Sequence, residues 1–234
     1  MLRALALLVF WAMASVLVGL IGIPWALLSG KGDLLYRLGI GVELAGVRLV
    51  GVKIEVVGLE KLDRHRTYIF MCNHVSNLDP PIVMPVIPRR TSVLVKKELF
   101  RIPVLGWAMH LTSLVPVDRS NREAAVASLR RAADVLKSGI NITVWPEGTR
   151  SPDGRLQSFK KGPFHLAMES GVPIVPITLA GTHAIWPKGE FAVHPGTATV
   201  IFHEAIDPAA YSDQDALIEA VRQRIRSGLE EKYQ

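Results

Sequence analysis

Two side chains within residues 70–79 have the types and spacing needed for proton transfer. His74 and Asp79 lie five positions apart, where an apolar run gives way to polar residues. A neutral imidazole accepts a proton near neutral pH, and a carboxylate on its other nitrogen fixes the tautomer and stabilises the imidazolium. The pair therefore predicts a general base. The alternative is a polar histidine at a strand end, because such pairs also arise by chance.

A second polar segment, residues 147–151 (Glu-Gly-Thr-Arg-Ser), also follows an apolar run. Its glycine lets the backbone approach a ligand closely, and its arginine can donate two parallel hydrogen bonds to a phosphate. A solvated turn is the alternative. Lys97, Arg119 and Lys161 lie near the ends of other expected elements. Each of the two lysines follows another lysine, and at least one member of each pair is expected to be solvated surface.

Alternating strands and helices must position these groups. Strand-like runs occupy residues 52–57, 68–72, 92–95, 113–117, 142–145, 172–179 and 197–202. Helical patterns follow Asp79 and occupy residues 104–111, 121–138, 161–170 and the segment from about 212 onward. This order predicts an α/β fold with a mainly parallel or mixed sheet of about seven strands flanked by helices. Both polar segments follow strands, where open α/β sheets bind ligands.

Local signals mark the ends of two of these helices. Ser120 and Glu123 have the spacing of a capping box at the start of the 121–138 helix, and Gly139 follows its end. Ser212 and Asp215 have the same spacing before the last helix. These signals predict where both helices begin.

The amino-terminal segment is strongly apolar. Residues 4–30 contain no charged side chain, and residues 4–23 would extend roughly 30 Å as a helix, one hydrocarbon thickness. We therefore expect a membrane-associating segment at residues 1–50 before an α/β domain at residues 51–234. Pro24 leaves open a straight span or a re-entrant hairpin. A cleaved signal peptide is a less favoured alternative, since only Arg3 supplies a positive charge before the apolar run.

Residues 31–50 mix charged and apolar side chains. They fit either an amphipathic helix on lipid headgroups or an ordinary surface helix. The whole chain carries 27 Lys and Arg against 21 Asp and Glu, a net charge of +6. This charge suits an anionic membrane, a phosphate group or an acidic carrier protein. A nucleic-acid partner is disfavoured because no basic and aromatic platform is evident.

The cysteine and histidine content argues against a metal centre or a disulfide. Cys72 is the single cysteine, which excludes an internal disulfide and a cysteine-based zinc cluster. The histidines other than His74 show no spacing typical of a metal site. Cys72 and Ser76 lie close to His74 in sequence, but we interpret them as a buried strand residue and a loop residue, not as nucleophiles.

Four segments in order resemble the glycerolipid acyltransferase family, most closely its bacterial 1-acylglycerol-3-phosphate acyltransferases. They lie within about residues 50–205 and match the family's His-x4-Asp motif and its three later blocks: residues 73–79, 106–119, 145–151 and 172–177. Two departures occur, since Trp145 stands where phenylalanine is usual and Pro116 interrupts an apolar strand. Neither departure removes a chemical group, so they bear on packing and acyl preference.

The resemblance implies transfer of a fatty acyl group from acyl-CoA or acyl carrier protein to the sn-2 hydroxyl of 1-acyl-glycerol-3-phosphate, giving phosphatidic acid. His74 would be the general base and Asp79 its orienting partner. No acyl-enzyme is required, because the thioester is already activated, and the resemblance implies no metal or cofactor. An oxyanion hole is expected, with donors that the sequence does not identify. The residues expected to bind the glycerol phosphate are Arg119, Glu147, Gly148, Thr149 and Arg150, with Lys97 and Lys161 as further candidates.

Such an enzyme would work at the inner membrane with its catalytic domain facing the cytoplasm, because one substrate is carrier-bound and the other is a lipid. Two alternatives remain open. One is an acyltransferase for another lyso-lipid, such as a lyso-aminolipid or a lysophospholipid. The other is a non-catalytic membrane protein that binds lipid.

Overall fold

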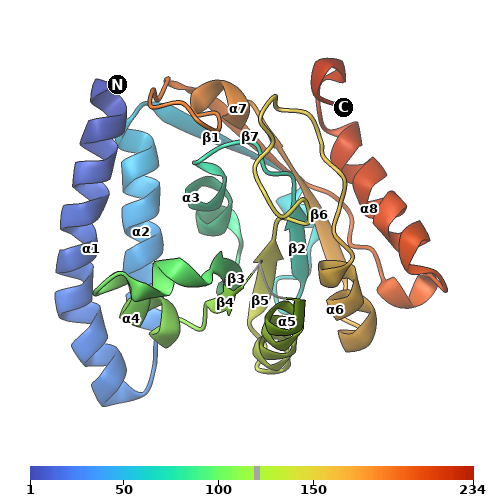
Figure 1. Ribbon diagram of the computed structural model, residues 1–234, viewed down its shortest axis with the longest axis horizontal. Helices are drawn as coiled ribbons and strands as arrows, with labels where there is room; N and C mark the ends of the chain where they lie inside the picture. The colour runs from blue at the N-terminus through green and yellow to red at the C-terminus, as the bar shows by residue number, and fades with distance from the viewer. Residues whose placement is uncertain (119–121) are drawn as a thin grey trace.

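The computed structural model describes residues 1–118 and 122–234, and Figure 1 shows its arrangement. The helices are α1 (Leu2–Ser29), α2 (Asp33–Leu49), α3 (Asp79–Val83), α4 (Leu105–Leu111), α5 (Arg122–Lys137), α6 (Gly162–Ser170), α7 (Thr182–Ile185) and α8 (Gln214–Ser227). The strands are β1 (Val52–Val57), β2 (Ile69–Cys72), β3 (Thr91–Lys96), β4 (Val115–Val117), β5 (Asn141–Val144), β6 (Ile174–Ala180) and β7 (Gly196–Phe202).

The strands form one seven-stranded sheet in the order β1-β7-β6-β2-β5-β3-β4. Neighbouring strands are parallel except β6 and β7, which are antiparallel. The prediction of a mainly parallel or mixed sheet of about seven strands is confirmed. Strand β2 lies near the centre, and all four of its residues are buried. A strand covered on both faces needs such a continuous apolar run.

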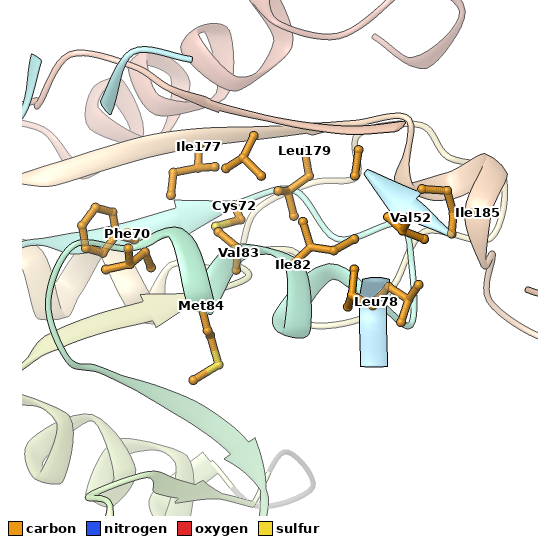
Figure 2. Close-up of a cluster of buried hydrophobic side chains, with 14 of the residues drawn as sticks. Val52, Phe70, Cys72, Leu78, Ile82, Val83, Met84, Ile177, Leu179 and Ile185 are labelled. Atoms are coloured by element: carbon orange, nitrogen blue, oxygen red, sulfur yellow. The ribbon is translucent and has the colours of Figure 1, made fainter. Parts of the chain in front are cut away.

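Helices cover both faces of the sheet (Figure 1). One face packs against α2 and α3, and the other packs against α5, α6 and α8. Figure 2 shows Leu78, Ile82 and Val83, at the start of α3 and within it, beside Phe70 and Cys72 of β2. All five side chains are fully buried. This packing holds the start of α3 against the end of β2, the two elements that carry Asp79 and His74.

The two amino-terminal helices lie side by side at one edge of the molecule (Figure 1). Helix α1 runs unbroken through Pro24 and ends at Gly30, which has φ 67°. Among the described residues it is the helix long and apolar enough to cross a membrane, and only 17% of its most apolar stretch is buried. Of the two arrangements left open at Pro24, the structure therefore has the continuous helix.

Helix α2 packs between α1 and α3, with Leu35 and Val47 buried. It is thus enclosed by protein on two sides and does not lie only on a membrane surface. Val47 and Val50 belong to the same apolar cluster as Phe70. The division of the chain at residue 50 stays a prediction, since this cluster extends across it.

Gly46 allows α1 and α2 to approach closely. A Cβ added there would collide with the Trp11 indole and lie 2.9 Å from Leu7. Gly46→Ala is therefore expected to lower the free energy of unfolding by about 1–3 kcal/mol. The control is Gly41→Ala on the same helix, where a Cβ meets nothing within 4 Å. It should be neutral or stabilise by up to about 1 kcal/mol. Thermal unfolding in detergent measures both, and equal effects would contradict the packing argument.

Most predicted element boundaries differ from the structure by one or two residues, and two of the differences have a clear local cause. The last helix is capped by Asp213, whose carboxylate accepts hydrogen bonds from the backbone N–H groups of Asp215 and Ala216. The expected cap, Ser212, lies one residue too early. Strand β4 begins at Val115 and not at Ser113, because Ser113 has φ 64°, which is incompatible with a strand. Ser120, the expected cap of α5, lies outside the described residues.

Candidate active site

His74 and Asp79 are in direct contact. The His74 Nδ1 atom lies 2.8 Å from Asp79 Oδ2. The same carboxylate oxygen accepts hydrogen bonds from the backbone N–H groups of Val75 (2.7 Å) and Ser76 (2.8 Å). Asp79 is fully buried, whereas 16% of the His74 side chain is exposed. The carboxylate therefore holds Nδ1 and leaves Nε2 as the ring nitrogen able to take a proton from a ligand.

Hydrogen bonds connect the loop that carries His74 to the neighbouring strand β6 and to the segment after α7. Asn73 accepts a hydrogen bond from the Leu179 N–H (2.7 Å) and donates one to the Leu179 carbonyl (3.0 Å). The Asn73 side chain thus binds both backbone polar groups of Leu179 beyond the point where β2 ends. The Ser76 hydroxyl donates to the Trp186 carbonyl at 2.9 Å. Asn73 and Ser76 are consequently occupied in holding the loop.

Cys72 is poorly suited to act as a nucleophile. It is fully buried in β2. Burial raises the pKa of the Cys72 thiol well above its ordinary value, and the nearby Asp79 carboxylate raises it further. The thiolate is the reactive form of cysteine, so this thiol stays unreactive at neutral pH.

Glu147 contacts the backbone of His74, and both of its carboxylate oxygens accept hydrogen bonds. One accepts a hydrogen bond from the His74 backbone N–H (2.6 Å), and the other accepts two from Gln157, through its backbone N–H (3.0 Å) and its side-chain amide (3.1 Å). Only 2% of Glu147 is exposed. The sequence suggested contact with the substrate, but the structure gives Glu147 a different place: it links the loop after β5 to the backbone of His74.

Burial raises the pKa of Glu147 to about 7, the hydrogen bonds from His74 and Gln157 lower it, and the Asp79 charge raises it. The folded protein therefore keeps a proton up to about pH 7 that an unfolded glutamic acid releases near 4.5. The free energy of unfolding should fall by about 1–3 kcal/mol as pH rises through this window. Denaturant unfolding at pH 5 and 7.5 measures the change.

In the Glu147→Gln variant the fall in stability with rising pH should be smaller. Glu43, whose pKa burial also raises to about 7, keeps its own contribution, and His203, whose pKa burial lowers to about 4, contributes with the opposite sign in both proteins. Glu98→Gln is the control, since Glu98 is an exposed carboxylate paired only with Lys96. An unchanged pH dependence in Glu147→Gln would contradict the assignment of the proton to this group.

Three residues of the loop after β5, Gly148, Thr149 and Arg150, are at least partly exposed and lie beside a neighbouring lysine. Gly148 has φ 75°, a conformation that favours glycine. Thr149 is exposed, and its hydroxyl accepts a hydrogen bond from Lys188 Nζ (3.4 Å), which also donates to the Arg150 carbonyl (3.1 Å). The stem of Lys160 passes within 3.5 Å of where a Cβ on Gly148 would stand. Together with Lys160 and Lys188, this loop therefore forms a positively charged surface.

The two lysines expected at the site are paired elsewhere. Lys161 Nζ lies 2.7 Å from an oxygen of Asp215 at the start of α8, and Lys97 forms an ion pair with Asp118. In each lysine pair the preceding residue is nearer the site, since Lys160 packs on Gly148 and Lys96 lines the cavity described below. Arg119 lies outside the described residues.

A cavity of about 630 Å³ opens beside His74. His74, Lys96 and Arg150 contribute to its lining, so the structure brings the predicted base and the predicted phosphate ligand to one site. The Trp145 ring packs on the imidazole, with ring centroids 5.0 Å apart. Apolar side chains from α1, α2, α3, β3 and α4 form much of the remaining wall, among them Val18, Leu35, Ile40, Met84, Val93, Val95, Leu105 and Met109. A polar mouth and an apolar interior suit an amphiphilic ligand.

Several residues of this site could not be predicted from the sequence. Gln157 and Lys188 reach the loop after β5 from segments far along the chain, and no motif marks either of them. The cavity wall from α1 and α2 was also not foreseen. In the part of the chain that the structure describes, no three His, Cys, Asp or Glu side chains gather to hold a metal ion. The expectation of no metal stays a prediction.

Several curated proteins resemble this chain in sequence. The chain is 39% identical over 193 residues to a 1-acyl-sn-glycerol-3-phosphate acyltransferase of Limnanthes alba, covering 82% of this chain and 66% of the relative. It is 33% identical over 167 residues to the Pseudomonas aeruginosa protein of the same name, covering 70% and 62%. The chain thus spans just under two thirds of these curated relatives.

A solved structure resembles the chain over nearly its whole length. The 1-acyl-sn-glycerophosphate acyltransferase PlsC from Thermotoga maritima matches with a TM-score of 0.80 and 27% identity, covering 97% of this chain and 95% of that one. The family model described as Acyltransferase matches residues 53–180, more than half of the chain and the part that contains His74, Asp79 and the loop after β5. The chain therefore belongs to the Acyltransferase family.

Proposed function

We propose that this protein transfers a fatty acyl group from acyl-CoA or acyl carrier protein to the sn-2 hydroxyl of 1-acyl-glycerol-3-phosphate, giving phosphatidic acid. The observation that carries the proposal is the position of His74, which is held by Asp79 and lines one cavity together with Arg150. That arrangement supplies a base, an anion ligand and an apolar chamber in one place. The names of the relatives support the same acceptor.

In the proposed reaction, His74 Nε2 accepts the proton of the acceptor hydroxyl as its oxygen attacks the thioester carbonyl. The new carbon–oxygen bond forms, the carbon–sulfur bond breaks, and the imidazolium returns the proton to the departing thiolate. Asp79 stabilises the imidazolium through Nδ1, at 2.8 Å. No covalent intermediate with the protein is needed, and no cofactor is required beyond the acyl donor.

The phosphate of the acceptor and the acyl chain of the donor require different surroundings. The phosphate is expected to bind the loop after β5, through the Arg150 guanidinium, the Thr149 hydroxyl and the Gly148 backbone. Arg119 is assigned to the same phosphate by its motif. The acyl chain of the donor fits the apolar part of the cavity, where removal from water favours binding.

Helix α1 supports a membrane location, because it is apolar, long enough to span, and largely uncovered by protein. We propose that it inserts in the inner membrane with the α/β domain on the cytoplasmic side. An anionic membrane surface would attract the net charge of +6. The lyso-lipid would then reach the site from the bilayer.

A donor and acceptor panel tests the function. Full-length protein in detergent or vesicles is given acyl-CoA or acyl carrier protein with 1-acyl-glycerol-3-phosphate, lysophosphatidylcholine or a lyso-aminolipid, and free thiol and product are measured. The phosphate monoester should be preferred by about 10- to 100-fold, because the phosphodiester of lysophosphatidylcholine has less negative charge to pair with Arg150 and the lyso-aminolipid has no phosphate. Preference for another acceptor would reassign the substrate. Lipid binding without thiol release would indicate a non-catalytic protein.

A further inference from the structure

The cavity beside His74 contains one acidic side chain among its described lining residues, Glu43 of α2. Its Oε2 atom is buried and has no hydrogen-bond partner in the described part of the chain. No described Lys, Arg or His lies within ion-pair distance of it. A buried carboxyl without a partner is unfavourable, so each such group needs a physical explanation.

Two polar side chains near Glu43 make hydrogen bonds with other groups. The Trp11 indole N–H donates to the Val42 carbonyl at 3.3 Å. The Tyr36 hydroxyl accepts a hydrogen bond from the Thr91 N–H at 3.2 Å. The protein itself therefore provides no evident partner for the unpaired oxygen.

The chemical state of Glu43 follows from these surroundings. Burial alone raises the pKa of Glu43 to about 7, and no hydrogen bond or nearby cation among the described residues opposes that rise. Near neutral pH the carboxyl is thus present in both its neutral and its charged form. The neutral form can donate and accept a hydrogen bond, and the charged form can accept one. Either form can bind a hydroxyl group, whereas neither gains anything from a methylene.

We propose that Glu43 selects the acyl chain by hydrogen bonding to a hydroxyl group on it, so that the cavity prefers hydroxylated fatty acyl chains over plain chains of equal length. The inference rests on the proposed function only in that the cavity holds an acyl chain. Glu43 and His74 line the same cavity, so a chain that enters beside His74 can reach the carboxyl. The hydroxyl could belong to the chain of the donor or to that of the lyso-lipid.

The test compares plain hexadecanoyl-CoA with a series of hydroxyhexadecanoyl-CoA donors in which the hydroxyl moves along the chain. A parallel series places the hydroxyl on the acyl chain of the acceptor. The ratio of kcat/KM for the hydroxylated and plain substrates is measured by thiol release. Wild type should favour one hydroxyl position by about five- to tenfold, the effect of one buried hydrogen bond. Whichever series shows the preference identifies the chain that occupies the cavity.

Two substitutions and a control assign the preference to Glu43. Glu43→Gln keeps a donor and an acceptor and should keep the ratio within about twofold. Glu43→Leu removes both and should bring the ratio to about one, with turnover of the plain chain maintained or raised. Met84→Leu changes another lining residue without changing its polarity, so it should affect both substrates equally. A ratio near one for wild type in both series, or a preference that survives Glu43→Leu, would overturn the inference.

A binding measurement separates this inference from the proposed reaction. Displacement of a dansyl-labelled fatty acid by hydroxylated and plain fatty acids reports occupancy of the cavity without turnover. A hydroxyl preference that depends on residue 43, in a protein that releases no thiol, would support the inference and contradict the proposed function. Thiol release with no hydroxyl preference in either measurement would support the function and overturn the inference.

Discussion

Replacing His74 with alanine is expected to lower kcat/KM for thioester turnover by about 10²- to 10⁴-fold, the usual contribution of a positioned general base. The substitution removes the ring nitrogen that would take the proton of the acceptor hydroxyl. It leaves the loop in place, because the backbone N–H of His74 still donates to Glu147 and its carbonyl still accepts from Ser151 (2.7 Å). The loss should therefore appear in kcat with little change in KM for either substrate.

The matched control is His165→Ala. His165 is exposed on α6 and lies 3.7 Å from Glu169 in a solvent-exposed pair, so its removal should alter turnover less than about twofold. Thiol release and product formation are measured for both variants, and thermal unfolding confirms that each is folded. Turnover of His74→Ala at close to the wild-type rate would exclude His74 as the base.

Asp79→Asn is expected to lower kcat by about 10²- to 10⁴-fold near neutral pH, although it preserves the shape of the side chain. An asparagine oxygen in the place of Oδ2 can still accept from the backbone N–H groups of Val75 and Ser76. It carries no charge to stabilise the imidazolium, so proton transfer to Nε2 becomes less favourable. The loss should therefore appear in kcat while the free energy of unfolding changes little, a pattern that loss of packing would not produce.

Asp79→Ala provides the contrast. It leaves the buried N–H groups of Val75 and Ser76 without an acceptor, which costs about 1–3 kcal/mol for each unpaired group. The alanine variant should therefore lose stability as well as activity, whereas the asparagine variant should lose mainly activity. Equal stability and equal kcat for Asp79→Asn and wild type would show that the carboxylate has no role in the proton transfer.

The pairing of His74 with Asp79 could be predicted because it is local. Five residues separate the two side chains, and the end of β2 and the start of α3 place them together without help from distant segments. The sheet could likewise be predicted, since strand-like runs alternate with helical patterns along the whole chain. The sheet is mixed because β7 runs antiparallel to β6.

The positions of Glu147 and the lysines could not be predicted, because their contacts join segments that are far apart in the sequence. Glu147 is positioned by Gln157 and by the backbone of His74, and its motif gives no sign of either partner. Adjacent lysines differ only in the direction of their side chains, which depends on the local backbone. Lys161 forms its ion pair with Asp215, a residue of the last helix. Contacts between such distant segments are a property of the folded chain alone.

The pairing of β1 with β7 also affects the order in which the protein can be made. Val52 pairs with Gly196, so β1 cannot pair with β7 until about 140 more residues have been synthesised. At about 5–20 residues per second, ribosomal synthesis of that interval takes roughly 7–30 s. Helix α1 emerges from the ribosome well before the sheet can close. A nascent chain that stops before β7 would keep the edges of β1 and β6 unpaired, a state prone to aggregation.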